Sequence, residues 1–158
     1  LRCGMSILPS TLLLLHLLAA AFWVGGMAVM HFAVRPAAVE TLEPPKRLGL
    51  MAGALSRFFV GVSVSIVVLL ASGLWMVMLA GGFGRVHWSV HAMFGIGLLM
   101  MALFLHIRFA PYRRLRRAIV AGDWPLAAEQ LGSIRKLVAV NLGLGVLVFV
   151  TAVLGRAV

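Results

Sequence analysis

Acidic residues are scarce in this sequence, which has 4 Asp and Glu against 14 Lys and Arg. Charged residues of both signs make up only 11% of its 158 residues. In an average soluble domain they make up about a quarter. Hydrophobic residues make up 63% of the chain, a proportion typical of proteins embedded in a lipid bilayer. This composition excludes an ordinary soluble enzyme or binding module.

Cysteine is almost absent as well, because Cys3 is the only one. A single thiol cannot build an intrachain disulfide, a zinc knuckle or an iron–sulfur cluster. The acidic residues Glu40, Glu43, Asp123 and Glu129 all lie outside the long apolar runs, which excludes a carboxylate proton relay inside the membrane. The sequence also lacks a glycine-rich phosphate loop, a nucleophile elbow and a zinc-protease motif, so nothing supports hydrolytic or nucleotide-driven chemistry.

Four long apolar runs are present, at residues 11–34, 58–79, 90–109 and 137–154. Each is long enough to cross a bilayer. Within hydrocarbon the backbone must satisfy its own hydrogen bonds, and runs without the alternation of a barrel strand do so as helices. We therefore predict an all-α, integral membrane four-helix bundle of up-down-up-down order, with residues 1–158 forming a single transmembrane domain.

The basic residues are concentrated in two of the three connections. Eleven of the 14 lie in or beside residues 35–57 and 110–136, namely Arg35, Lys46, Arg47, Arg57, Arg108, Arg113, Arg114, Arg116, Arg117, Arg135 and Lys136. Connections rich in Lys and Arg face the cytoplasm, which predicts cytoplasmic connections at 35–57 and 110–136 and both termini outside. The positive charge is thus explained by topology and by contact with the lipid bilayer, and we expect no nucleic-acid partner.

Each of these basic connections contains an acidic residue followed closely by proline. Glu43 precedes Pro44 and Pro45, and Asp123 precedes Trp124 and Pro125. Proline in the first turn after a capping residue is typical of a helix start. We therefore predict the capped start of a short helix at each pattern, followed by residues 46–51 in the first and 126–131 in the second.

The two halves of the sequence share one spacing of residues. In each half two histidines lie 15 residues apart and a proline follows five residues later: His16, His31 and Pro36 in the first half, and His91, His106 and Pro111 in the second. Repeated spacing of this kind predicts two helix-pair units, 1–80 and 81–158, related by a pseudo-twofold axis along the membrane normal.

Histidines inside a membrane segment indicate a functional site, and neutral imidazole is a good metal ligand. Fifteen helical residues rise about 22 Å, which puts one histidine of each helix near either side of the membrane. We predict that His16 faces His91 at the outer level and His31 faces His106 at the inner level. Each pair would supply the axial ligands of a haem b.

Haem propionates need cations near the membrane edge. The candidate donors are Arg35, Arg57, Arg108 and Arg135. With one or two haems the bundle would act as a bis-histidine cytochrome, a membrane oxidoreductase that carries electrons between a quinone or redox protein at one face and an acceptor at the other.

Copper is an alternative to haem. Met27, Met30 and His31 lie on one helical face, and His87 and His91 are spaced as an i, i+4 pair. Thioether and imidazole groups are suitable ligands for Cu(I). A third alternative is a scaffold without cofactor, in which the histidines only form hydrogen bonds between helices.

The sequence resembles the CopD family of bacterial inner-membrane proteins. The resemblance is carried by Leu15-His16, Trp23, Gly25-Gly26, Arg35-Pro36, His91, His106, Ile134-Arg135, Asn141-Leu142 and Gly145. It implies copper uptake or handling across that membrane, often with a periplasmic copper-binding partner. The first-helix pattern is also similar to the HemJ-type protoporphyrinogen oxidases, which bind haem b, but Asn141 is followed here by Leu142 rather than by an acidic residue and proline. That departure puts protoporphyrinogen oxidation in doubt.

Overall fold

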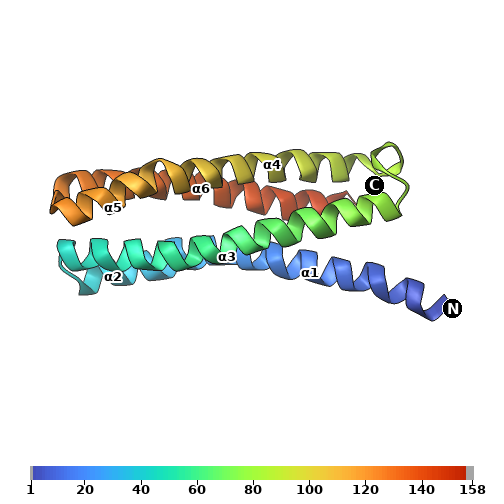
Figure 1. The fold of residues 1–158 in the computed structure, drawn as a ribbon, viewed down its shortest axis with the longest axis horizontal. Helices are drawn as coiled ribbons and strands as arrows, with labels where there is room; N and C mark the ends of the chain where they lie inside the picture. Colours follow the sequence, from blue (N-terminus) through green and yellow to red (C-terminus); the bar gives the residue numbers. More distant parts are fainter. Residues whose placement is uncertain (1, 156–158) are drawn as a thin grey trace.

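The computed structural model describes residues 2–155, with side chains from residue 7 onward, as two long helical hairpins lying side by side (Figure 1). The Cys3 side chain therefore lies outside the described side chains. The elements are α1 (Arg2–Val29), a π-helical turn η1 (Met30–Val34), α2 (Arg35–Thr41), α3 (Pro44–Leu79), a 3-10 turn η2 (Phe83–Arg85), α4 (Trp88–Phe109), α5 (Pro111–Ala121) and α6 (Trp124–Leu154). Helix α1 packs mainly on α3, and α4 and α5 pack mainly on α6.

Four helical stretches are long and apolar enough to cross a membrane: Ile7–Thr41, Pro44–Leu79, Trp88–Ala121 and Trp124–Leu154. Residues 2–155 contain no strand, which confirms the predicted all-α membrane bundle. Large apolar side chains cover its outside, for example Met78 at 73% exposed and Phe32 at 70% exposed. Such a surface is suited to lipid rather than water, and the protein is a multi-pass membrane protein.

The start of α1 and the end of α6 lie at one end of the bundle, which we call the terminal end (Figure 1). The α2–α3 and α5–α6 connections lie at the opposite end, which we call the basic end because most of the Lys and Arg residues are there. Consecutive long helices therefore run in opposite directions, as the up-down-up-down prediction requires.

Helices α3 and α6 are longer than their apolar runs. Their starts agree with the predicted capping patterns: Pro44 opens α3, and Asp123 caps α6 by accepting the Leu126 N–H at 3.0 Å. The prediction that these helices are short is wrong, because each continues without a break into the spanning run. The 36 residues of α3 extend about 54 Å, well beyond a hydrocarbon layer of about 30 Å.

The backbone differs at the two equivalent prolines. Proline has no N–H, and its ring collides with the carbonyl of the residue four positions earlier in a regular helix. Before Pro36 the chain widens into the π-helical turn η1, where the Arg35 N–H bonds to the Met30 carbonyl. Before Pro111 the chain breaks instead, at Ala110 with φ −108° and ψ −85°. The repeat in the sequence therefore does not give identical local structure, and the two-unit duplication stays a prediction.

A ladder of aromatic rings joins the two hairpins. Trp23 lies 6.2 Å from Phe104, Phe104 lies 5.5 Å from Phe59, and Phe59 lies 5.1 Å from Tyr112, all in edge-to-face geometry. The Tyr112 hydroxyl donates to the Ala52 carbonyl at 3.2 Å, which ties α5 to α3. Because aromatic pairs of this geometry attract beyond simple packing, this core fixes how the hairpins meet.

Replacing Tyr112 by phenylalanine is expected to lower the unfolding free energy by about 1 kcal/mol, because it removes the hydrogen bond to Ala52 and keeps the ring contacts. Thermal unfolding of the detergent-solubilised protein measures this, and a fall of a few degrees is expected. In Tyr112→Leu, which also removes the ring, the midpoint of thermal unfolding should fall further. An unchanged midpoint in Tyr112→Phe would show that the hydroxyl bond contributes nothing.

Candidate functional site

A cavity of about 500 Å³ lies between α1, α3, α4 and α6 in the terminal half of the bundle. We call it the terminal-end cavity. Most of its lining is apolar, and its polar side chains are His16, His87 and Ser89. Four methionines also line it: Met76, Met93, Met100 and Met101. The cavity thus combines imidazole and thioether groups, and no acidic residue lines it.

His16 is held in one orientation by Ser72. Its Nδ1 lies 2.9 Å from the Ser72 Oγ, and that hydroxyl donates to the Val68 carbonyl at 2.6 Å. A hydroxyl carries a single hydrogen, so the Ser72 oxygen accepts from Nδ1–H of His16. This assignment follows from the hydrogen-bond network. The Leu69 carbonyl is a further hydrogen-bond partner of the His16 ring, and with the proton on Nδ1 the other ring nitrogen, Nε2, keeps a lone pair that can bind a ligand.

Gly73 makes room for this imidazole on α3. A Cβ placed at Gly73 would lie 3.2 Å from the Cε1 of His16. On α6, a Cβ at Gly145 would lie 2.7 Å from Val24 and 3.3 Å from the Cε of Met100. Ser72 and Gly73 were not predicted as site residues, because they lie on a helix without histidine, although they interrupt an otherwise Val- and Leu-rich run.

The structure does not bring together the predicted histidine pairs. His16 lines the terminal-end cavity, whereas its predicted partner His91 is exposed and packs near the Phe83 ring at 5.8 Å. His31 lines the cavity at the basic end, whereas His106 is exposed on α4. Within the described residues no three His, Cys, Asp or Glu side chains gather as a metal cluster.

The rotation of α4 explains this separation. Met100 is buried and marks the side of α4 that faces the core. Successive helical residues turn about 100°, so His91 lies about 180° and His106 about 120° away from Met100. Both therefore point away from the bundle interior. The haem b hypothesis consequently gains no support from the arrangement of the histidines.

The alternative copper residues are also spread over the molecule. Met27 is 1% exposed in the core, Met30 and His31 line the basic-end cavity, and His87 lines the terminal-end cavity. His87 precedes α4 as its capping residue and accepts the Ser89 N–H, so it does not form a helical i, i+4 pair with His91.

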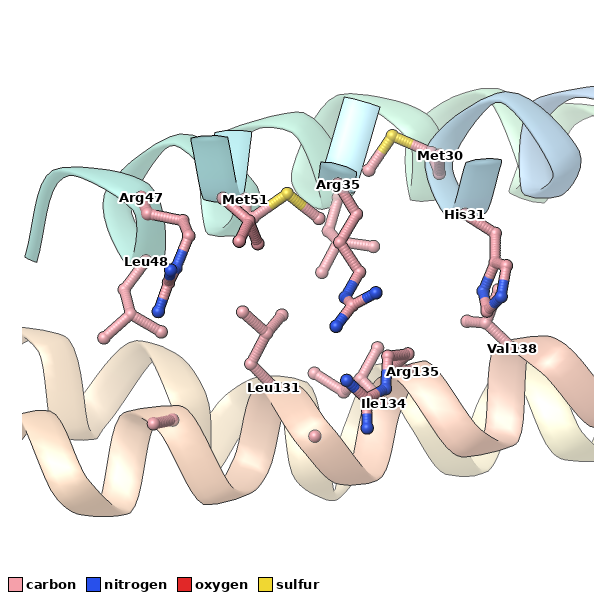
Figure 2. Close-up of a pocket in the computed structure, with 14 residues that line it drawn as sticks. Met30, His31, Arg35, Arg47, Leu48, Met51, Leu131, Ile134, Arg135 and Val138 are labelled. Atoms are coloured by element: carbon pink, nitrogen blue, oxygen red, sulfur yellow. The ribbon is translucent and has the colours of Figure 1, made fainter. Parts of the chain in front are cut away.

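The second cavity, of about 340 Å³, lies at the basic end between the η1–α2 segment, α3 and α6 (Figure 2). We call it the basic-end cavity. Arg35, Arg47, Arg135 and His31 are its charged or polar side chains. Two of the four predicted propionate donors, Arg35 and Arg135, thus share one cavity. Arg108 instead stacks over the Tyr112 ring at 5.4 Å, and Arg57 is exposed elsewhere on α3.

The two cavities are separated by part of the apolar core. On α1, Trp23 lines the terminal-end cavity and Met30 lines the basic-end cavity, and the buried Met27 lies between them. Phe59 and Phe104 close the core at the same level through their ring contact. The bundle therefore has one cavity in each half and a packed core between them.

Comparison with known protein families gives one match. The family model for copper resistance protein D, CopD, matches residues 52–154. The matched segment begins within α3 and ends with α6, and so includes Ser72, Gly73 and the four cavity methionines. No curated protein and no solved structure matches the chain. Because the family model covers more than half of the sequence, the chain belongs to the CopD family of copper-resistance-related membrane proteins.

Proposed function

We propose that this protein handles copper and that Cu(I) binds in the terminal-end cavity. The observation that carries the proposal is the His16 imidazole, oriented by Ser72, in the same cavity as four methionine thioethers. Cu(I) is a soft cation that favours thioether and imidazole ligands over carboxylates. Membership of the CopD family supports the same assignment.

The electrostatics of the two cavities favour the terminal end. Met30 and His31 are also suitable ligand types, but they share the basic-end cavity with three arginines. Guanidinium groups carry a positive charge at all relevant pH values, and in surroundings of low dielectric constant they repel a metal cation. The terminal-end cavity contains no Lys or Arg side chain in its lining.

The distribution of basic residues gives the orientation of the terminal-end cavity in the membrane. The basic end faces the cytoplasm by the positive-inside rule, so the terminal-end cavity faces outward. In the bacterial inner membrane this would let a periplasmic copper-binding protein deliver Cu(I) to the cavity. Met27, buried between the two cavities, would then provide a thioether on the route inward.

Competition for Cu(I) with a chromophoric chelator tests the proposal. The purified protein is expected to withdraw Cu(I) from the chelator, and the Met93→Leu/Met101→Leu variant should bind it at least about tenfold more weakly. Leucine conserves most of the side-chain volume, so the fold should persist. The matched control is Met78→Leu, because Met78 is 73% exposed on the outer surface of α3 and should not affect affinity.

Two results would contradict the copper assignment. The first is a wild-type protein that takes no Cu(I) from the chelator. The second is equal affinity in the cavity variant and the Met78→Leu control. An absorption spectrum of the same sample, oxidised and reduced, tests the haem alternative directly, because a b-type cytochrome would show a Soret band.

A further inference from the structure

The basic-end cavity gathers three guanidinium groups without a counter-charge. Arg35 comes from α2, Arg47 from α3 and Arg135 from α6, and Figure 2 shows Arg35 and Arg135 pointing toward one another across the cavity. No acidic residue lines it. Arg35 and Arg47 are partly buried, so water screens their mutual repulsion less than at a free surface. Arg135 is exposed, and an anion bound between the three side chains would relieve their mutual repulsion.

The donor set fits a phosphate group. A guanidinium presents a planar fork of N–H donors that binds phosphate or carboxylate oxygens in pairs. Donors that come from three separate helices can surround a tetrahedral group on several sides. The nearest carboxylates in sequence, Glu40, Glu43 and Glu129, are exposed and do not line the cavity.

The remaining walls of the cavity are apolar. They are formed by Met30, Val39, Leu48, Met51, Leu55, Ala128, Leu131, Gly132, Ile134 and Val138. A small hydrophilic anion would leave these side chains without a partner, whereas a molecule with both a phosphate and hydrocarbon would contact both parts of the lining. The cavity is therefore amphipathic in the same sense as a phospholipid.

The position of the cavity along the membrane normal agrees with a phospholipid ligand. Arg35 follows directly on the first apolar run, and Arg135 lies just before the last one. Both therefore lie where the hydrocarbon layer ends and lipid phosphates begin. Basic pockets between membrane helices at this level bind anionic head groups.

We propose that the basic-end cavity binds the phosphate group of an anionic phospholipid, held by Arg35, Arg47 and Arg135, with the start of its acyl chains against Leu48, Met51 and Val138. The lipid would bridge α2, α3 and α6 at the basic end. This site lies in a different cavity from the proposed Cu(I) site and does not depend on copper binding.

Native mass spectrometry of the full chain in detergent tests the proposal. The protein is exposed to phosphatidylglycerol or to phosphatidylcholine with identical acyl chains, and phosphatidylglycerol should be retained selectively. Arg35→Gln/Arg135→Gln should lower its affinity by about tenfold per guanidinium removed. The control Arg113→Gln/Arg116→Gln removes the same charge from the α5 surface groove outside the cavity and should retain the lipid as wild type does.

Equal loss of lipid in the two double variants would overturn the proposal, because it would mean that net charge alone attracts the lipid. Equal retention of both lipids by the wild type would overturn it as well. Arg35→Lys/Arg135→Lys keeps the charge without the fork and should bind with intermediate affinity, which guards against a folding defect in the glutamine variant. Calorimetry with inorganic phosphate separates the two sources of the anion: binding of phosphate without phosphatidylglycerol would overturn the lipid assignment.

Discussion

Substitution of His16 by alanine is expected to abolish high-affinity Cu(I) binding to the purified protein. Among the described residues, His16 is the one histidine that lines the terminal-end cavity from within a spanning helix, and its Nδ1 is hydrogen-bonded to Ser72. The four thioethers that remain would be weak, flexible ligands. Chelator competition should show a loss of at least about a hundredfold in affinity.

Ser72→Ala tests how far Cu(I) affinity depends on the orientation of the His16 ring. It removes the oxygen that accepts from Nδ1 but keeps the imidazole, so the ring loses its preferred tautomer and orientation. Loss of such a supporting partner typically weakens metal binding by about 10- to 100-fold. The affinity of Ser72→Ala should therefore lie between those of wild type and His16→Ala.

His91→Ala is the matched control, because it removes another histidine near the terminal end whose side chain is exposed outside the cavity. It should bind Cu(I) as wild type does. The haem hypothesis makes the opposite prediction, since His16 and His91 would then be equivalent axial ligands. Equal defects in His16→Ala and His91→Ala would therefore contradict the cavity site.

The helices could be predicted from the sequence because their signal is spread over many residues. Runs of about 20 apolar residues have few alternatives in a bilayer, and Asp123 and Pro44 mark helix starts by local chemistry. The continuity of α3 and α6 through the basic connections was missed. Those segments are less apolar than the spans, but they contain nothing that ends a helix.

The site was harder to predict because it depends on how each helix is rotated. The spacing of His91 and His106 repeats that of His16 and His31, but spacing along one helix does not determine which face meets the neighbours. On α4 the core-facing side is defined by Met100 and Phe104. In a membrane helix the opposite face is apolar as well, so no hydrophobic periodicity reveals the rotation. For the same reason, the sequence did not reveal that Arg47 shares a cavity with Arg35 and Arg135.

Close packing between α1 and α3 depends on two reciprocal pairs of glycine and phenylalanine. A Cβ at Gly26 on α1 would overlap the ring of Phe58 on α3, and a Cβ at Gly61 on α3 would lie 2.5 Å from the ring of Phe22 on α1. Small residues let membrane helices approach closely where there is no hydrophobic driving force between them. Phe58 also packs against the buried Phe59 at 6.3 Å, so its ring has little freedom to move.

Gly26→Ala is therefore expected to destabilise the bundle by about 1–3 kcal/mol, as overpacking does in a well-packed core. Gly25→Ala provides the matched control, because a Cβ at Gly25 meets nothing within 4 Å. Alanine favours a helix over glycine by up to about 1 kcal/mol, so this variant should be neutral or more stable. Unfolding of the full chain in mixed micelles measures both. If the unfolding free energy falls in Gly26→Ala and rises in Gly25→Ala, the difference is due to the contact with Phe58, because both variants make the same substitution at adjacent helix positions. A destabilised Gly25→Ala would contradict this packing.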